Sequence, residues 1–187
     1  HSPAQHGFWR AHVGWFLSSK DFAPDFRLVN DLMKYPELRW LDRFDILIAI
    51  ALGAAMFGLG ALLQYTSPEL GTTPGQMLVW GFFISTVVCS HATYTINSLS
   101  HVFGNQRYRT GDTSRNNWWL AILTLGEGWH NNHHHYCNST RQGFYWWEYD
   151  ITFYGLKMLS WLGIIWDLKP VPVNVRDHHP RRIKQLA

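Results

Sequence analysis

The stretch ILIAIALGAAMFGLGALL, residues 46–63, contains no charged residue and no strongly polar one. As a helix that rises 1.5 Å per residue, it covers about 27 Å, close to the roughly 30 Å thickness of a bilayer's hydrocarbon core. Its three glycines would weaken a soluble helix, whereas Gly and Ala let membrane helices approach each other closely. The stretch predicts a membrane-spanning helix over 44–65, and a buried core helix is the alternative.

A second apolar segment, 76–96, begins QMLVWGFFISTVVC, and the sequence SPELGTTPG that precedes it is typical of a turn. The second half of this segment contains Ser90, His91 and Thr93, which fit a membrane helix only where they face protein or a cavity. We therefore expect an all-α membrane protein in which 44–65 and 76–96 form a transmembrane helical hairpin.

The positive charges predict the orientation of this hairpin. All sixteen Lys and Arg residues lie outside 44–96, and the turn carries only Glu69. Because positively charged flanks stay in the cytoplasm, both ends of the chain are predicted to be cytoplasmic in a multi-pass integral membrane protein. We expect 1–43 to be cytoplasmic or interfacial and 97–187 to form a cytoplasmic helical cap. Within the cap, the aromatic stretch 144–168 predicts a helix at headgroup level.

The composition excludes several other classes of protein. Aromatic residues make up 16% of the chain, which is too many for a disordered or low-complexity sequence. Two cysteines are too few for a disulfide scaffold or a cysteine-based zinc ribbon. A net charge of +3 with scattered basic residues gives no reason to expect a nucleic-acid partner.

Two short clusters contain histidines at the spacing of metal ligands. Asn97 and His101 stand at i and i+4 in NSLSH, and His130, His133 and His134 stand at i, i+3 and i+4 in GEGWHNNHHHY. These spacings place each set on one helical face. Neutral imidazole suits iron, zinc and copper, so the second cluster predicts a metal site, with a purely structural role as the alternative. By the same spacing, the neighbouring His135 points off this face.

The motifs in this chain resemble those of the membrane fatty acid desaturases. HNNHH at 130–134 looks like the third histidine box of that family, and NSLSHVFG at 97–104 is similar to its NSxxHxxG segment. GFWRAHVGW at 7–15 resembles the aromatic segment after the second box. The segments SRNNWW and WWEYD are similar to the bacterial, delta-9-type branch. In this comparison, 1–187 corresponds to the C-terminal part of a desaturase domain without the first two boxes.

The resemblance implies a reaction and a set of metal ligands. It implies an oxygen-dependent di-iron acyl desaturase that introduces a cis double bond into a saturated acyl chain while O₂ is reduced to water. His101, His130, His133 and His134 would bind two ferrous ions directly, and Asn97 would reach iron through a water. Because the family uses nine histidine ligands, we expect the 187-residue chain alone to bind iron weakly and to be inactive.

The resemblance also implies a substrate channel and partner proteins. Trp15, Thr93, Tyr94 and Trp129 adjoin the motifs and are candidates for the channel wall, although ordinary packing explains them equally well. Lys20 stands where animal members place basic residues against the carrier headgroup, but the serine before it weakens the case for coenzyme A. The substrate would be an acyl-CoA or an acyl-lipid. Electrons would come from a separate donor of the ferredoxin, rubredoxin or cytochrome b5 type with its reductase.

Two other functions compete with desaturation. A related membrane hydroxylase or ketolase shares histidine-rich boxes, but the NSxxHxxG and WWExD context argues against it. A non-enzymatic membrane metal-binding or transport protein would need polar residues along its membrane helices, and 46–63 has none.

Overall fold

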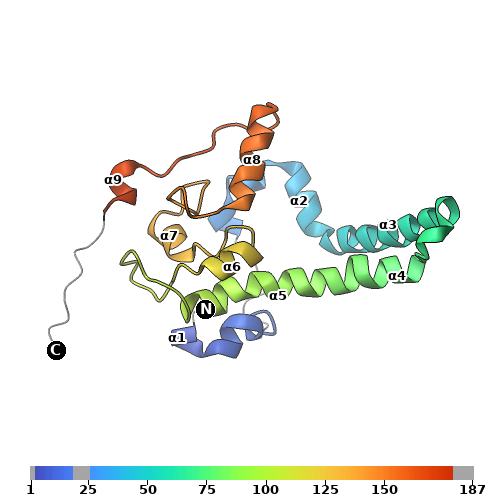
Figure 1. Ribbon diagram of the computed structural model, residues 1–187, viewed down its shortest axis with the longest axis horizontal. Helices are drawn as coiled ribbons and strands as arrows, with labels where there is room; N and C mark the ends of the chain where they lie inside the picture. Colours follow the sequence, from blue (N-terminus) through green and yellow to red (C-terminus); the bar gives the residue numbers. More distant parts are fainter. Residues whose placement is uncertain (1–2, 19–25, 179–187) are drawn as a thin grey trace. The chain divides into compact units, whose positions relative to one another are not determined.

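The computed structural model describes residues 3–18 and 26–178, and all the regular secondary structure in these ranges is helical. The main helices are α1 (Pro3–His6), α2 (Pro36–Arg43), α3 (Asp45–Thr66), α4 (Pro74–Leu78), α5 (Ser85–Ser98), α6 (Trp118–Leu123), α7 (His130–His135), α8 (Ile151–Trp161) and α9 (Val173–Arg176). A π-helical segment, Val79–Ile84, joins α4 to α5, and a 3-10 turn, Leu99–His101, follows α5. The chain forms two compact units, one from 18–91 and one from 1–17 with 92–187, and each is described by itself (Figure 1).

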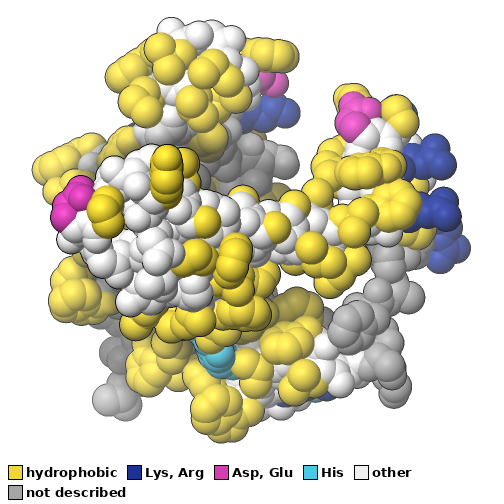
Figure 2. All heavy atoms as spheres, turned by 90° about the vertical axis from the view of Figure 1, so that its right-hand side faces the viewer, with side chains coloured by type: hydrophobic (Ala, Val, Ile, Leu, Met, Phe, Trp, Pro, Cys, Tyr) yellow, Lys and Arg dark blue, Asp and Glu magenta, His cyan; other side chains and the backbone are white. Residues whose placement is uncertain are grey.

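The first of these units contains α3 and α4, which lie side by side. Within the described residues, two helices are long and apolar enough to cross a membrane, Asp45–Thr66 and Pro74–His101, and the second is longer than the 76–96 that the sequence predicts. Most of the large apolar side chains of α3 are exposed, among them Ile46, Ile50 and Leu62. Figure 2 shows that hydrophobic side chains cover much of the surface seen from the α3–α4 turn. Such a surface suits lipid as its solvent rather than water.

Glycine allows α3 and α4 to pack closely. Gly53 and Gly60 are the buried residues of α3. A Cβ at Gly60 would lie 2.6 Å from Pro74 Cα and 2.8 Å from the Thr73 carbonyl oxygen. The Thr73 side chain accepts a hydrogen bond from the Gln76 backbone N–H, and the Gln76 side chain accepts one from the Thr73 N–H, which together cap α4. The turn is therefore fixed at the point where the two backbones meet.

We expect Gly60→Ala to destabilise this unit by about 1–3 kcal/mol, because backbone atoms would have to move away from the new methyl group. Gly58→Ala is the matched control, since nothing lies within 4 Å of a Cβ at Gly58. Alanine there should be neutral or stabilising. Thermal unfolding in detergent would measure both, and equal effects of the two substitutions would contradict the close approach at Gly60.

The second unit has a core in which polar side chains are prominent. The buried apolar residues include Tyr108, Leu120, Trp129 and Phe144. The buried polar residues are Ser98, Ser100, Ser114, Asn116, His130, Asn131, Asn132, Ser139, Glu148 and Asp150. Because a buried polar group is costly unless it is hydrogen-bonded, such a core depends on specific partners.

The predicted helix over 144–168 is only partly correct, because α8 covers Ile151–Trp161 alone. The Asp150 side chain accepts a hydrogen bond from the Phe153 N–H at 2.9 Å, so it caps α8 and sets where the helix begins. Asp150 also accepts one from the Gln142 N–H at 2.7 Å, which anchors it in the core. Beyond α8, Gly163 has a φ of 70°, a left-handed conformation that ends the helix.

Candidate metal centre

Three histidines from two elements converge in the second unit. His101 ends the 3-10 turn after α5, whereas His130 and His134 lie one helical turn apart on α7. The Nε2 atoms of His101 and His130 are 3.2 Å apart, and one nitrogen from each of the three rings lies within 4.8 Å of the others. Imidazole nitrogens bind metals such as zinc at about 2.0–2.1 Å, so two ligands of one ion lie about 3 Å apart. The spacing of His101 and His130 fits a shared metal ion.

His133 lies beside this group rather than in it. Its ring centroid is 6.2 Å from that of His130, and the two rings are nearly parallel. The rings of His130 and His134 are closer, at 4.3 Å. The helix geometry explains the difference, since i and i+4 differ by about 40° around the axis whereas i and i+3 differ by about 60° in the other direction. His133 therefore remains a predicted ligand outside the three-histidine group.

The sequence predicts that His135 is not a ligand and that Asn97 reaches iron through a water. His135 stacks on Tyr108 with ring centroids 3.9 Å apart, and its Nε2 contacts the Val175 carbonyl oxygen at 3.1 Å. It points off the ligand face, as its spacing predicts. Asn97 lies one turn before His101 with an exposed side chain, and its contact with iron through a water stays a prediction.

Burial favours the neutral form of His130 and His133. Burial, followed by the nearby His134, His101 and His133, lowers the pKa of His130 from 6.5 to about 3. Burial, followed by His134, also lowers the pKa of His133. Because only a neutral imidazole has a free nitrogen lone pair, both side chains can bind a metal at neutral pH.

Asp112 contacts this centre as a carboxylate. Its Oδ2 lies 2.6 Å from His134 Nδ1. Burial acts to raise the pKa of Asp112, but hydrogen bonds from Ser114, Thr110 and His134 outweigh it and hold the pKa below its usual range. The negatively charged carboxylate of Asp112 therefore faces Nδ1 of His134.

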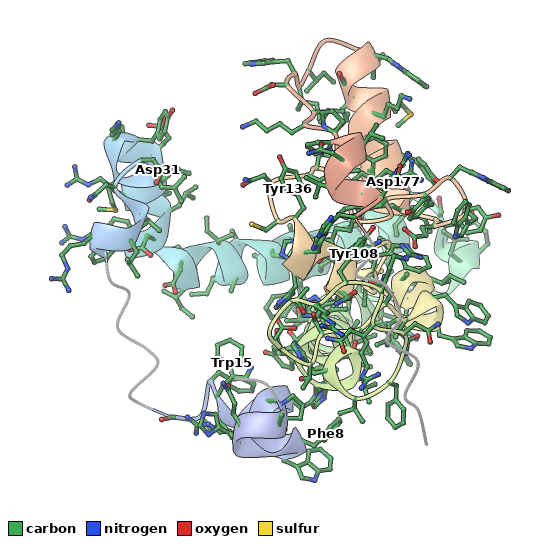
Figure 3. All side chains as sticks on the ribbon, turned by 90° about the vertical axis from the view of Figure 1, so that its left-hand side faces the viewer. Phe8, Trp15, Asp31, Tyr108, Tyr136 and Asp177 are labelled. Carbon is green, nitrogen blue, oxygen red and sulfur yellow. The ribbon has the colours of Figure 1, made fainter. Side chains whose placement is uncertain are left out.

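The predicted channel residues fall into two places in this unit. Trp15 packs edge-to-face on Tyr94 with ring centroids 6.1 Å apart, and His12 and Phe16 also contact the Tyr94 ring. Figure 3 shows Trp15 on the same N-terminal segment as Phe8. The third candidate on this side, Thr93, is exposed one residue before Tyr94.

Trp129 lies elsewhere, immediately before His130. Its indole N–H donates to the Tyr149 carbonyl oxygen at 2.8 Å. It lines an apolar pocket of about 270 Å³ with Trp118, Trp147 and Tyr149. The remaining candidate, Lys20, lies outside the described residues.

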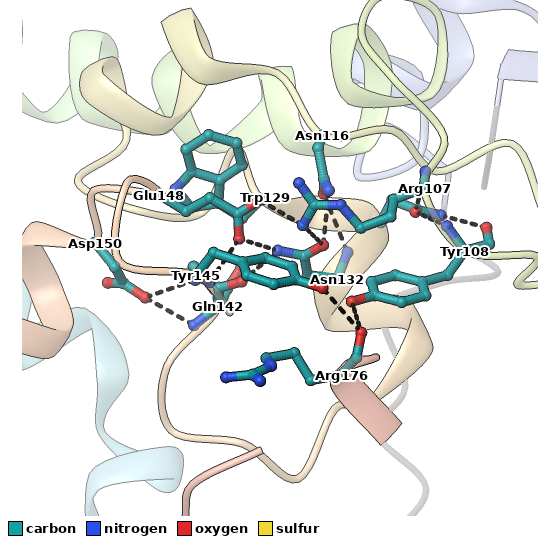
Figure 4. Close-up of polar contacts among 12 residues, drawn as sticks. Arg107, Tyr108, Asn116, Trp129, Asn132, Gln142, Tyr145, Glu148, Asp150 and Arg176 are labelled. Atoms are coloured by element: carbon teal, nitrogen blue, oxygen red, sulfur yellow. Dashed lines mark hydrogen bonds and ion pairs between the residues drawn. The ribbon is translucent and has the colours of Figure 1, made fainter. Parts of the chain in front are cut away.

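A buried polar network that the sequence did not predict contacts α7 (Figure 4). The fully buried Glu148 forms an ion pair with Arg107. Glu148 Oε2 also accepts hydrogen bonds from the Asn132 side-chain amide at 2.9 Å and the Tyr145 backbone N–H at 3.1 Å. Since Asn132 is part of α7, the network anchors the histidine-bearing helix. The single acidic residue between aromatics in FYWWEY is the signal that could have suggested it.

Asn131 fixes the other side of α7. Its side-chain oxygen accepts from the backbone N–H groups of Arg107 and Tyr108, at 2.9 and 2.7 Å. Its side-chain amide donates to the Tyr108 carbonyl oxygen at 3.0 Å and to Ser114 Oγ at 3.3 Å. The two asparagines within HNNHH are therefore structural residues that attach α7 to the loop after His101.

These features define a helical protein with two candidate membrane-spanning helices and a histidine cluster suited to a metal ion. A sequence model of the family described as fatty acid desaturase matches residues 2–159. The chain belongs to the fatty acid desaturase family, as its motifs predict.

Three relatives illustrate the range of the family. The chain is 38% identical over 167 residues to an sn-1 stearoyl-lipid 9-desaturase of Synechocystis sp., covering 89% of this chain and 48% of the relative. It is 37% identical over 186 residues to an acyl-CoA 5-desaturase of Anemone leveillei, covering 98% and 52%. It is 38% identical over 172 residues to a chloroplastic palmitoyl-monogalactosyldiacylglycerol delta-7 desaturase of Arabidopsis thaliana, covering 90% and 43%. The chain thus spans about half the length of the curated relatives it matches.

Proposed function

We propose that this chain is the histidine-bearing C-terminal part of an oxygen-dependent di-iron acyl desaturase. The observation that carries the proposal is the approach of His101, His130 and His134, with two Nε2 atoms 3.2 Å apart. Iron suits imidazole ligands, and the centre offers neutral ones. His101, His130 and His134 would hold iron. His133, and Asn97 through a water, would contribute to the same pair of ions.

The bound iron would supply the oxidising power to break two unactivated C–H bonds, which no side-chain acid or base can do. In the overall reaction O₂ accepts two electrons and two protons from the two broken C–H bonds of the acyl chain, two electrons from a donor protein and two protons from solvent, and leaves as two waters. The chain's own residues would bind and orient the substrate. The aromatic cluster of Trp15 and Tyr94, together with Trp129 beside His130, would form the dry wall of an acyl channel.

We further propose that 44–65 and 76–96 form a transmembrane hairpin with both chain ends and the histidines in the cytoplasm. The absence of Lys and Arg from 44–96 supports this orientation. Delta-9 regiochemistry is our preferred assignment because NSxxHxxG and WWExD are similar to that branch. Relatives named as 5- and 7-desaturases make the double-bond position the point to test.

Expression of the complete reading frame in a host that lacks its own desaturase tests the proposal. We expect new cis-monounsaturated acyl chains, with the double bond located by mass spectrometry. Hydroxylated products, or no product from an iron-loaded membrane protein supplied with electron donors, would overturn it. The 187-residue chain alone carries too few of the expected ligands to complete two iron sites, so we expect it to be inactive.

A further inference from the structure

His101 and His134 each contact a loop residue through the Nδ1 atom of the ring. His134 Nδ1 lies 2.6 Å from Asp112 Oδ2, and His101 Nδ1 lies 3.1 Å from Thr113 Oγ1. Asp112 and Thr113 are consecutive, so one short loop reaches two histidines that come from different elements. In both rings this leaves Nε2 for the ion.

The loop holds Asp112 in place independently of His134. Asp112 Oδ1 accepts hydrogen bonds from the Thr110 hydroxyl and the Ser114 backbone N–H, both at 2.8 Å. The Asp112 carbonyl oxygen accepts one from the Gln106 side-chain amide at 3.1 Å. The buried Asn131 then fastens the loop to α7, through Ser114 Oγ and the Tyr108 backbone. The carboxylate is therefore pre-positioned on the same support as the histidines.

Asp112 and Thr113 differ in what they impose on their partners. A carboxylate only accepts hydrogen bonds, so it requires a proton on the nitrogen that it contacts. In a neutral imidazole the proton on Nδ1 leaves the lone pair on Nε2. A hydroxyl can either donate or accept, so Thr113 orients the His101 ring without selecting its tautomer.

We propose that Asp112 is a positioning residue of the metal centre, which fixes His134 as the Nδ1–H tautomer with its Nε2 lone pair facing the ion. The proposal rests on the proposed metal site and assigns a role to a residue outside the histidine motifs. Removal of an outer hydrogen-bond partner of a ligand histidine typically weakens metal binding by about 10–100-fold. Asp112 should lie within that range, and Thr113 below it.

The main variant is Asp112→Asn, which keeps the shape of the side chain and an oxygen for the bonds from Thr110 and Ser114 but removes the charge. Asp112→Ala removes the acceptor altogether. Asp42→Asn is the matched control, because it makes the same chemical change on an exposed residue of α2. Thr113→Val removes the hydroxyl from His101 with little change of shape. Thermal unfolding in detergent checks that each variant folds.

Two measurements on the complete protein in detergent test the proposal. In metal-free protein labelled with ¹⁵N-histidine, the His134 signals, assigned with His134→Gln, report its tautomer. We expect the Nδ1–H form in the parent and in Asp42→Asn, a mixture in Asp112→Ala, and the Nε2–H form in Asp112→Asn, whose amide N–H₂ faces His134 Nδ1. Competition with a chelator for Zn²⁺ should show about 10-fold weaker binding in Asp112→Ala and up to about 100-fold weaker binding in Asp112→Asn, because the asparagine amide would donate to His134 Nδ1 and favour the proton on Nε2.

An unchanged tautomer, or Zn²⁺ affinity within twofold of the parent in a folded Asp112→Asn and Asp112→Ala, would overturn the role of Asp112. These readouts do not depend on desaturation. A protein that forms no unsaturated product but shows the expected changes would refute the proposed function and leave the role of Asp112 supported. Desaturation with an unchanged His134 tautomer would support the proposed function and refute the role of Asp112.

Discussion

Replacement of His130 by alanine in the complete protein is expected to abolish formation of the unsaturated product, with a loss of at least about 100-fold. His130 is buried at the centre of the cluster, with its Nε2 3.2 Å from His101 Nε2 and its ring 4.3 Å from that of His134. Loss of an outer partner alone costs 10–100-fold in metal affinity or activity, and loss of a direct ligand should cost more. Product analysis by mass spectrometry and the iron content of the purified protein would measure the effect.

His135→Phe is the matched control for this prediction. His135 belongs to the same helix, but it stacks on Tyr108 and contacts Val175 rather than the cluster. Phenylalanine preserves the stacking and removes only the hydrogen bond, so product and iron should stay close to parent levels.

His134→Ala, at a more exposed position, should reproduce the loss seen for His130→Ala with less risk to folding. Full activity of both alanine variants would contradict the assignment of these residues as ligands.

Local patterns in the sequence were sufficient to predict the helical class and the histidine cluster. An uncharged run of eighteen residues has few alternatives to a helix when its length matches a bilayer, and α3 covers it. The i and i+4 spacing of His130 and His134 is a property of helix geometry, so it predicted their approach. The i+3 spacing of His133 is compatible with the same face, yet its ring lies beside the group.

Long-range contacts could not be predicted in the same way. The stretch FYWWEY is rich in apolar residues and was interpreted as part of a helix, but Glu148 within it is fully buried against Arg107. That ion pair joins residues 41 positions apart, and no periodic pattern in the sequence indicates it. Asp112 was missed for a similar reason, since its contact with His134 spans 22 positions and depends on a loop without regular structure.

Replacement of Glu148 by glutamine is expected to cause the largest loss of stability in the described part of the chain, about 3–5 kcal/mol. Glu148 accepts bonds from Arg107, Asn132 and Tyr145, and its side chain is inaccessible to solvent. A glutamine amide would turn its N–H₂ group toward one of these donors and leave the Arg107 charge without its partner. The expected fall in unfolding midpoint in detergent is roughly 6–20 °C.

Glu69→Gln is the control, because Glu69 is exposed in the turn before α4 and its neutralisation should change the midpoint little. A double variant, Arg107→Met with Glu148→Leu, separates the ion pair from the network. Because apolar replacement of both charges removes the unpaired charge, it should recover part of the loss from Glu148→Gln. Recovery will be incomplete, since Asn132 on α7 and the Tyr145 N–H still lose their acceptor. If Glu148→Gln is as stable as Glu69→Gln, the network does not anchor α7, and the histidines must be held by the contacts of Asn131 and Asp112 alone.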